Sequence, residues 1–164
     1  MLILKIKYHI VAILKKCIYK IFFGRRFVVG KGTTFRDCFN IYLGKGATMS
    51  IGRDCFFNHN CSINSLGSIK IGDGCIFGEN VKIYDHNHRF SDVNKKIKEQ
   101  GYTIKEIEIG RHCWFGSNVV VLKGTHIGNN CVIGAGVVVD QDVPDNTIVK
   151  LNRELIFQAI KEKS

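Results

Sequence analysis

The chain has 164 residues, which is enough for one domain and too few for two of ordinary size. Hydrophobic residues make up 45% of it, which predicts a packed core and excludes general disorder. The net charge of +10 is uneven: residues 1–31 hold eight Lys/Arg and no acid, whereas the other 133 residues hold 16 Lys/Arg and 14 Asp/Glu. The basic character belongs to an N-terminal segment, which argues against a nucleic-acid-binding domain.

The first predicted element is a basic amphipathic helix within residues 1–26. Its residues 2–23 are too rich in lysine to cross a bilayer as one apolar segment. Four basic residues fall within about 60° of one another on a helical wheel, namely Lys5, His9, Lys16 and Lys20. Such a helix can make a peripheral membrane contact, or it can pack on its own domain or on a sister subunit. No signal peptide is visible, so we expect a cytoplasmic protein, peripheral on the inner face of the cytoplasmic membrane.

A six-residue period occupies residues 27–145. Small or β-branched residues stand two positions before large apolar ones, and the large ones recur at Ile109, Phe115, Val121, Ile127, Ile133 and Val139. The same frame occurs upstream, offset by two extra residues near Ser65-Leu66-Gly67. Each unit predicts one short strand and one turn, and three units close one coil. The predicted fold is therefore all-β, a parallel β-helix, followed by a helical C-terminal segment over residues 146–164.

Most of the cysteines obey this repeat. Five of the seven occupy the small inward position, namely Cys55, Cys61, Cys75, Cys113 and Cys131. Cysteine in such a position acts as a compact hydrophobic residue, so we expect free, buried thiols. Cys17 and Cys38 fall outside the repeat.

The repeat is interrupted once, by a polar, lysine-rich stretch that predicts a protruding loop over residues 84–106. The loop begins with the cluster Tyr84-Asp85-His86-Asn87-His88. A loop on a rigid scaffold is a common place for binding or catalysis. Histidine changes its protonation near neutral pH, so either ring could act as a general base.

The segments IGRDCF, IGDGCIFGEN and IGRHCWFGSNVVVLKGTHIGNNCVIGAGVVV resemble the hexapeptide-repeat acyltransferases. The Asp-His-x-His element, followed by a loop and Cys-Trp-Phe-Gly-Ser, is most similar to the acetyl-CoA-dependent sugar O-acetyltransferases, such as galactoside, maltose, capsule and lipopolysaccharide acetyltransferases. The resemblance covers about residues 27–145. It implies a left-handed β-helix, a homotrimer with active sites between subunits, acetyl-CoA as co-substrate and no metal.

The resemblance also implies roles for residues around the loop. His86 would be the general base, with His88 as the rival, and Asn58 would contact the acceptor sugar. From the residues themselves, Asp85 could orient the ring or form a turn, and we assign His59, beside Asn58, and Tyr84 to the acceptor.

For the cofactor, the resemblance places Trp114 near acetyl-CoA and the backbone N–H of Ser117 at the thioester carbonyl. The backbone around Gly134 and Ala135 would line the pantetheine arm. The chain departs from the family pattern after residue 139, where the usual Thr-Lys-Asp and the proline turn are missing. We therefore assign the phosphate and adenine contacts to substitute residues, which are Lys123, Lys150 and Arg153.

Together these features predict an O-acetyltransferase that acts on a sugar hydroxyl in capsule, lipopolysaccharide or exopolysaccharide biosynthesis, where the glycan acceptor can be lipid-linked. Three alternatives remain open. One is N-acetylation of an amino sugar, and another is a β-helix scaffold without catalysis. The third is a zinc protein like the γ-class carbonic anhydrases, with His86, His88 and either His59 or His112 as ligands.

Overall fold

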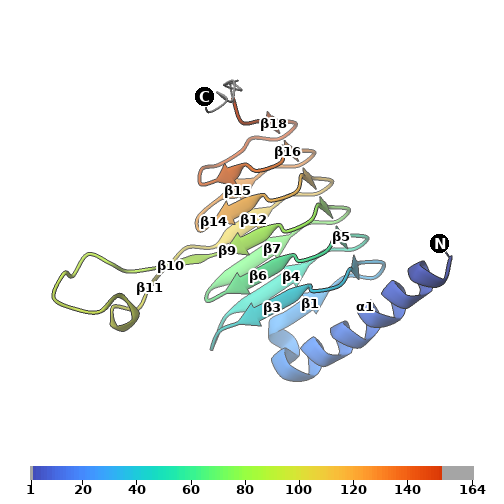
Figure 1. Cartoon of the computed structure of the whole chain (residues 1–164), viewed down its shortest axis with the longest axis horizontal. Helices are drawn as coiled ribbons and strands as arrows, with labels where there is room; N and C mark the ends of the chain where they lie inside the picture. The colour runs from blue at the N-terminus through green and yellow to red at the C-terminus, as the bar shows by residue number, and fades with distance from the viewer. Residues whose placement is uncertain (1, 153–164) are drawn as a thin grey trace, which may run out of the picture.

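The computed structural model describes residues 2–152, with side chains from residue 6 onward. A helix, α1 (Leu2–Phe23), is followed by a short 3₁₀ turn, η1 (Gly24–Arg26). A stack of flat coils then rises from this end of the molecule to the other, and a single loop projects from its side (Figure 1). No helix within residues 2–152 combines the length and apolar character needed to cross a bilayer.

Three parallel sheets form the three walls of the stack. The first wall consists of β1 (Phe27–Val29), β4 (Thr48–Ile51), β7 (Ser68–Ile71), β12 (Ile107–Ile109) and β15 (His126–Ile127). The second consists of β2 (Thr34–Phe35), β5 (Phe56–Phe57), β8 (Ile76–Phe77), β13 (Trp114–Phe115), β16 (Val132–Ile133) and β18 (Ile148–Val149). The third consists of β3 (Asn40–Leu43), β6 (Ser62–Ser65), β9 (Lys82–Tyr84), β14 (Val120–Leu122) and β17 (Val138–Val139).

Each coil gives one strand to each wall, so equivalent residues stack in columns. Ile63, Ile83 and Val121 are aligned in neighbouring strands of the third wall. In the second wall the rings of Phe57, Phe77 and Phe115 lie above one another, with centroids 4.3 Å and 4.6 Å apart. The all-β parallel β-helix predicted from the six-residue period is thus confirmed.

The five repeat cysteines are buried, as the pattern predicts. Their thiols also link successive coils, because each Sγ donates to a carbonyl oxygen of the coil above it. Representative bonds join Cys61 Sγ to Gly78 O at 3.1 Å and Cys75 Sγ to Gly110 O at 3.1 Å. Burial also raises the pKa of the Cys61 thiol. These thiols have a structural role in the interior.

The helix α1 packs across the first coil. Ala12 is buried against the solenoid, and the Tyr19 and Phe23 rings contact Phe27 edge to face. Lys15 Nζ and Tyr19 Oη both donate to Phe39 O, at 2.9 Å and 3.3 Å. The helix therefore covers the end of the core and satisfies a carbonyl of the lowest coil.

The structure differs from the sequence analysis at the C-terminal end. We expected residues 146–164 to be helical, but within residues 146–152 the chain forms β18, which pairs in parallel with β16. The repeat continues here because Ile148 and Val149 extend the ladder of the second wall. The rest of the predicted helix, residues 153–164, lies outside the described residues.

The loop predicted over residues 84–106 leaves the stack as an antiparallel hairpin. Its base is formed by β10 (His86–His88) and β11 (Tyr102–Ile104), and a 3₁₀ turn, η2 (Ile97–Glu99), lies near its tip. In Figure 1 the hairpin extends away from the third wall. Its base is therefore fixed by strand pairing.

A thiol reagent can test the cysteine ladder. In the folded protein we expect iodoacetamide to modify Cys17 and Cys38, which are exposed, about 100-fold faster than the five buried cysteines. Peptide mapping by mass spectrometry measures this difference. All seven thiols should react in guanidinium chloride, and rapid labelling of a repeat cysteine in the folded protein would contradict the structure.

Candidate active site

The candidate site lies where the chain leaves the third wall after β9. Asp85, the first residue beyond this strand, is fully buried, although carboxylates rarely enter a protein core without partners. Its two oxygens accept four hydrogen bonds. Oδ2 accepts from Ser65 Oγ at 2.7 Å and from Gly67 N at 2.8 Å, and Oδ1 accepts from Leu66 N at 2.8 Å. The fourth bond, at 2.9 Å, joins Oδ1 to His86 Nδ1.

The two extra residues in the repeat explain this arrangement. Ser65, Leu66 and Gly67 lie one coil below Asp85, and they form the corner where the sequence departs from its period. Because that corner is widened, two backbone N–H groups point at the carboxylate. A Cβ on Gly67 would lie 2.6 Å from Ile104 Cγ2 on β11, so glycine lets the hairpin base approach. The irregularity in the sequence therefore builds a cradle for one buried carboxylate.

Asp85 fixes the orientation of the His86 ring. Since Nδ1 faces the carboxylate, Nε2 is the nitrogen left for an external partner. The His86 side chain is 17% exposed, and its ring contacts Tyr102 edge to face with centroids 5.3 Å apart. Its neighbours thus fix the position of the imidazole, and the carboxylate of Asp85 favours the tautomer with a proton on Nδ1.

His88 has a different environment. It is exposed on the same hairpin strand, and its ring lies 4.5 Å from the Tyr102 ring. Among the described residues, no carboxylate hydrogen-bonds it. The two histidines left open by the sequence therefore differ in their hydrogen bonds, and only His86 is held by a buried acid.

Both histidines open onto one pocket of about 440 Å³. It is lined by Asn64, Tyr84, His86, Asn87, His88 and Phe90. Three of these residues were given no role from the sequence, namely Asn64, Asn87 and Phe90. Asn64 could have been found from the repeat, because it aligns with Tyr84 in the third wall.

The residues expected at the cofactor lie on another wall. Trp114 is on β13 in the second wall and is 55% exposed, between Ile76 and Val132 in the same column. Ser117 and Ala135 follow at the corner after this wall, where the coils approach closely. A Cβ on Gly116 would lie 2.6 Å from Ala135 N, so this corner requires glycine.

The remaining predicted residues are dispersed. Lys150 continues the corner of Gly134, which donates its N–H to Val149 O at 2.8 Å, whereas Lys123 lies at a different corner, beside the loop base. Asn58 also lies after the second wall, and the His59 ring packs against Tyr8 of α1 with centroids 5.8 Å apart. Neither lines the pocket around His86 in the same chain. Arg153 lies outside the described residues.

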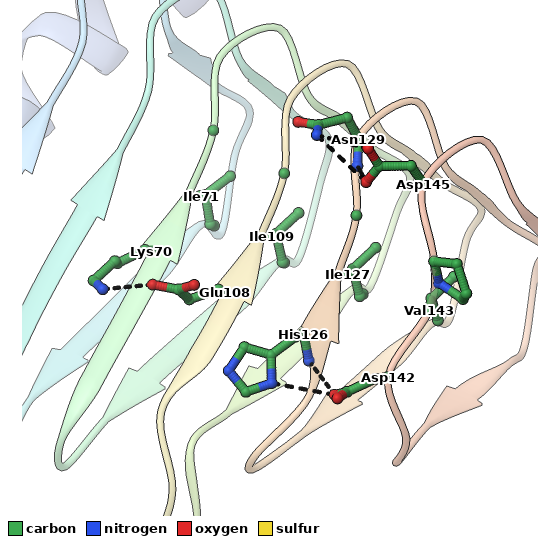
Figure 2. Close-up of a pocket in the computed structure, with 14 residues that line it drawn as sticks. Lys70, Ile71, Glu108, Ile109, His126, Ile127, Asn129, Asp142, Val143 and Asp145 are labelled. Atoms are coloured by element: carbon green, nitrogen blue, oxygen red, sulfur yellow. Dashed lines mark hydrogen bonds and ion pairs between the residues drawn. The ribbon is translucent and has the colours of Figure 1, made fainter.

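A larger groove on the first wall has a different character. Figure 2 shows that its charged groups are bound to one another: Lys70 pairs with Glu108, and His126 Nδ1 lies 3.2 Å from an oxygen of Asp142. Asn129 likewise hydrogen-bonds Asp145 (Figure 2). These pairs join neighbouring coils. The carboxylate beside His126 belongs to Asp142, which is exposed, so this imidazole lacks the buried acid that holds His86.

The zinc alternative receives no support from the geometry. Within the described part of the chain, no three His, Cys, Asp or Glu side chains converge as a metal site would require. In particular, His59 contacts Tyr8 and does not meet the His86 pocket.

Comparison with known proteins agrees with this geometry. A sequence family described as the hexapeptide repeat of succinyl-transferase matches residues 48–84 and 106–141, which flank the loop. A putative lipopolysaccharide biosynthesis O-acetyl transferase, WbbJ of Escherichia coli K12, is 34% identical over 77% of this chain and 65% of its own length. The chain spans between 35% and 65% of the lengths of the curated relatives it matches.

Two solved structures share the fold. A maltose O-acetyltransferase from Clostridium difficile 630 is 30% identical with a TM-score of 0.61, covering 84% of this chain and 68% of that one. The hexapeptide-repeat acetyltransferase VCA0836 of Vibrio cholerae, complexed with acetyl coenzyme A, is 28% identical with a TM-score of 0.70, covering 90% of this chain and 76% of that one. The chain belongs to the hexapeptide-repeat acyltransferase family.

The Asp85–His86 bond makes a spectroscopic prediction. In ¹⁵N NMR, neutral His86 should be the Nδ1–H tautomer, and Asp85→Asn should weaken this preference because an amide can also present its NH₂ to the ring. His88 serves as the internal control and should be unchanged by the substitution. An Nε2–H tautomer for His86 in the unmodified protein would refute the assignment.

Proposed function

We propose that this chain is an acetyl-CoA-dependent O-acetyltransferase that acts on a sugar hydroxyl, with His86 as general base. The single observation that carries the proposal is the Asp85–His86 pair, whose second ring nitrogen faces a pocket at the one break in the solenoid. A buried carboxylate that orients an imidazole is a common arrangement for removing a proton from an alcohol.

The reaction can be written from these groups. His86 Nε2 accepts the hydroxyl proton while the oxygen attacks the thioester carbonyl, and the new C–O bond forms. The C–S bond then breaks, and the proton on Nε2 passes to the leaving sulfur, so the products are the acetyl ester and free coenzyme A. Backbone N–H groups near Ser117 would stabilise the oxyanion, which in enzymes contributes about 2.7–4 kcal/mol per donor. No covalent enzyme intermediate is needed.

The distribution of residues supports a site shared between subunits. His86 lies by the third wall and the loop, whereas Trp114, Ser117 and Ala135 lie on or after the second wall. In a homotrimer, the pocket of one copy would face the second wall of its neighbour. The exposed column of Ile76, Trp114 and Val132 would then gain a partner.

The pocket chemistry fits a carbohydrate acceptor. Asn64 and Asn87 offer amide donors and acceptors, while Tyr84 and Phe90 offer aromatic surface. A role in surface polysaccharide biosynthesis is supported by the relative named for lipopolysaccharide O-acetylation. An amino sugar would use the same base and cofactor, so acceptor panels must contain both hydroxyl and amino sugars.

The base assignment can be tested with paired variants. His86→Ala should lower kcat/KM by about 10²–10⁴-fold, since that is the usual contribution of a general base. His88→Ala is the matched control, because it removes the same ring from the same pocket, and it should retain activity within about fivefold. The assay follows thiol release from acetyl-CoA with surface-glycan acceptors. Equal losses in the two variants would contradict the assignment, and failure of the unmodified protein to bind coenzyme A would favour a non-catalytic scaffold.

A second test addresses Trp114 and the shared site. Trp114→Ala should weaken acetyl-CoA binding by about tenfold through loss of aromatic contact, and Val28→Ala on the first wall is the control. Co-expressed His86→Ala and Trp114→Ala chains should restore activity, because about one shared site in four would combine both intact residues. Absence of restoration in verified mixed oligomers would show that each site lies within one chain.

A further inference from the structure

The outer face of α1 is apolar, and no side chain among residues 6–152 covers it. Seven large side chains there are between 47% and 80% exposed, namely Ile6, Ile10, Ile13, Leu14, Ile18, Ile21 and Phe22. They cover roughly half of the helical wheel. Lys7 also lies on this face and pairs with Asp37. Scattered apolar residues are ordinary on a protein surface, but seven large ones on one face of a helix mark an interaction surface.

The helix cannot rotate to bury this face, because its other side is bound to the solenoid. Lys15 and Tyr19 donate to Phe39 O, Lys20 Nζ donates to Phe27 O at 3.4 Å, and Ala12 is packed against the core. The two faces of α1 are therefore placed in an unusual way. Lysine and tyrosine side chains lie at or beside the contact with the first coil, and the aliphatic side chains point outward. The aliphatic face is therefore available to a partner beyond the described residues.

The surrounding charge identifies the class of partner. Residues 1–36 contain nine Lys/Arg and no acidic residue, and the first acid of the chain, Asp37, pairs with Lys7 of α1 at 3.7 Å. Lys20, Arg25 and Lys31 are exposed, and a groove of about 660 Å³ beside β1 combines Lys16 and Lys20 with Ile21 and Val28. A second copy of this helix, placed face to face, would bring like charges together. Anionic lipid headgroups would instead complement the cations while the acyl region receives the aliphatic side chains.

We infer that α1 lies in the headgroup region of an anionic bilayer, with its aliphatic face at the acyl boundary and the first coil held against the membrane. This surface contact suits a helix that is too charged to span. The three-fold assembly proposed above would add avidity, because three helices at the same end could bind together.

The His86 pocket lies at a fixed distance from the proposed membrane surface, and this affects which acceptors it can reach. This step rests on the proposed function. The loop leaves the third coil, and neighbouring strands lie about 4.8 Å apart, so the pocket stands roughly 10 Å above the first coil. A helix adds about 10 Å of diameter. The acceptor glycan of a lipid carrier would therefore reach His86 from the same membrane.

Co-sedimentation of the full chain with vesicles tests the contact. We expect binding to vesicles of phosphatidylglycerol and phosphatidylcholine, at least about tenfold weaker binding to phosphatidylcholine alone, and loss of binding as salt is raised. Ile13→Glu/Ile21→Glu should lower binding to the anionic vesicles by more than about tenfold. Val93→Glu/Ile97→Glu is the matched control, with two exposed apolar residues on the loop changed to the same acid, and it should bind within about twofold of the unmodified protein.

Cys17 provides a second readout, because it is exposed among the aliphatic residues of α1, whereas Cys38 is exposed between β2 and β3. An environment-sensitive fluorophore on Cys17, in a Cys38→Ser background, should shift to the blue on addition of anionic vesicles. The same label on Cys38, in a Cys17→Ser background, should shift less.

Three results would overturn the inference. One is a protein that stays in the supernatant with both vesicle types. Another is vesicle binding that survives Ile13→Glu/Ile21→Glu unchanged. The third is a Cys17 label that is already shielded without lipid, together with a smaller oligomer for Ile13→Glu/Ile21→Glu. That result would show that the aliphatic face of α1 contacts a second copy of the chain. Acetyl transfer to a soluble acceptor is measured separately, so its failure would not be mistaken for failure to bind membrane.

Discussion

Hydrogen bonding between successive coils is the constraint on which this molecule depends. Gly72 N donates to Ile109 O at 2.8 Å, and Gly110 N donates to Ile127 O at 2.7 Å, each bond joining one coil to the next. Such bonds form only if every coil has nearly the same outline, because the backbone groups must face one another. A constant coil outline in turn requires inward side chains of similar size every six residues. Because the walls are flat, each outward residue lies in line with the equivalent residue of the next coil.

The same constraint explains why the site lies at an irregular corner. A regular coil would present an apolar side chain inward, as Leu43 does in the coil below Ser65. Here Ser65 and then Asp85 occupy the interior, and a carboxylate in the core requires donors on every side. The widened corner supplies two of them from the backbone. The interruption of the repeat therefore creates both the exit of the hairpin and the polar interior that orients His86.

The ends of a stack of coils present a different physical problem. The first coil has no neighbour below it, so its core and its carbonyl groups would meet water. The helix α1 resolves this by covering Phe27 and by bringing lysine and tyrosine donors to Phe39 O. Because one face of α1 covers the first coil, its aliphatic face points away from the fold. That exposed face is the surface proposed to contact the membrane.

Features that depend on local repetition could be predicted from the sequence. The six-residue period predicted the parallel β-helix, the inward cysteines and the single loop, because each follows from which side chains fit a strand of fixed length. It did not predict β18, since the six-residue spacing that ends at Val139 is not kept between Val139 and Val149. The difference between the two histidines depends on contacts between coils, because Asp85 is oriented by residues about twenty positions earlier in the chain, in the coil below. The helical wheel likewise predicted a polar and an apolar face for α1. The contacts with Phe27 and Phe39 show that the aliphatic face points outward.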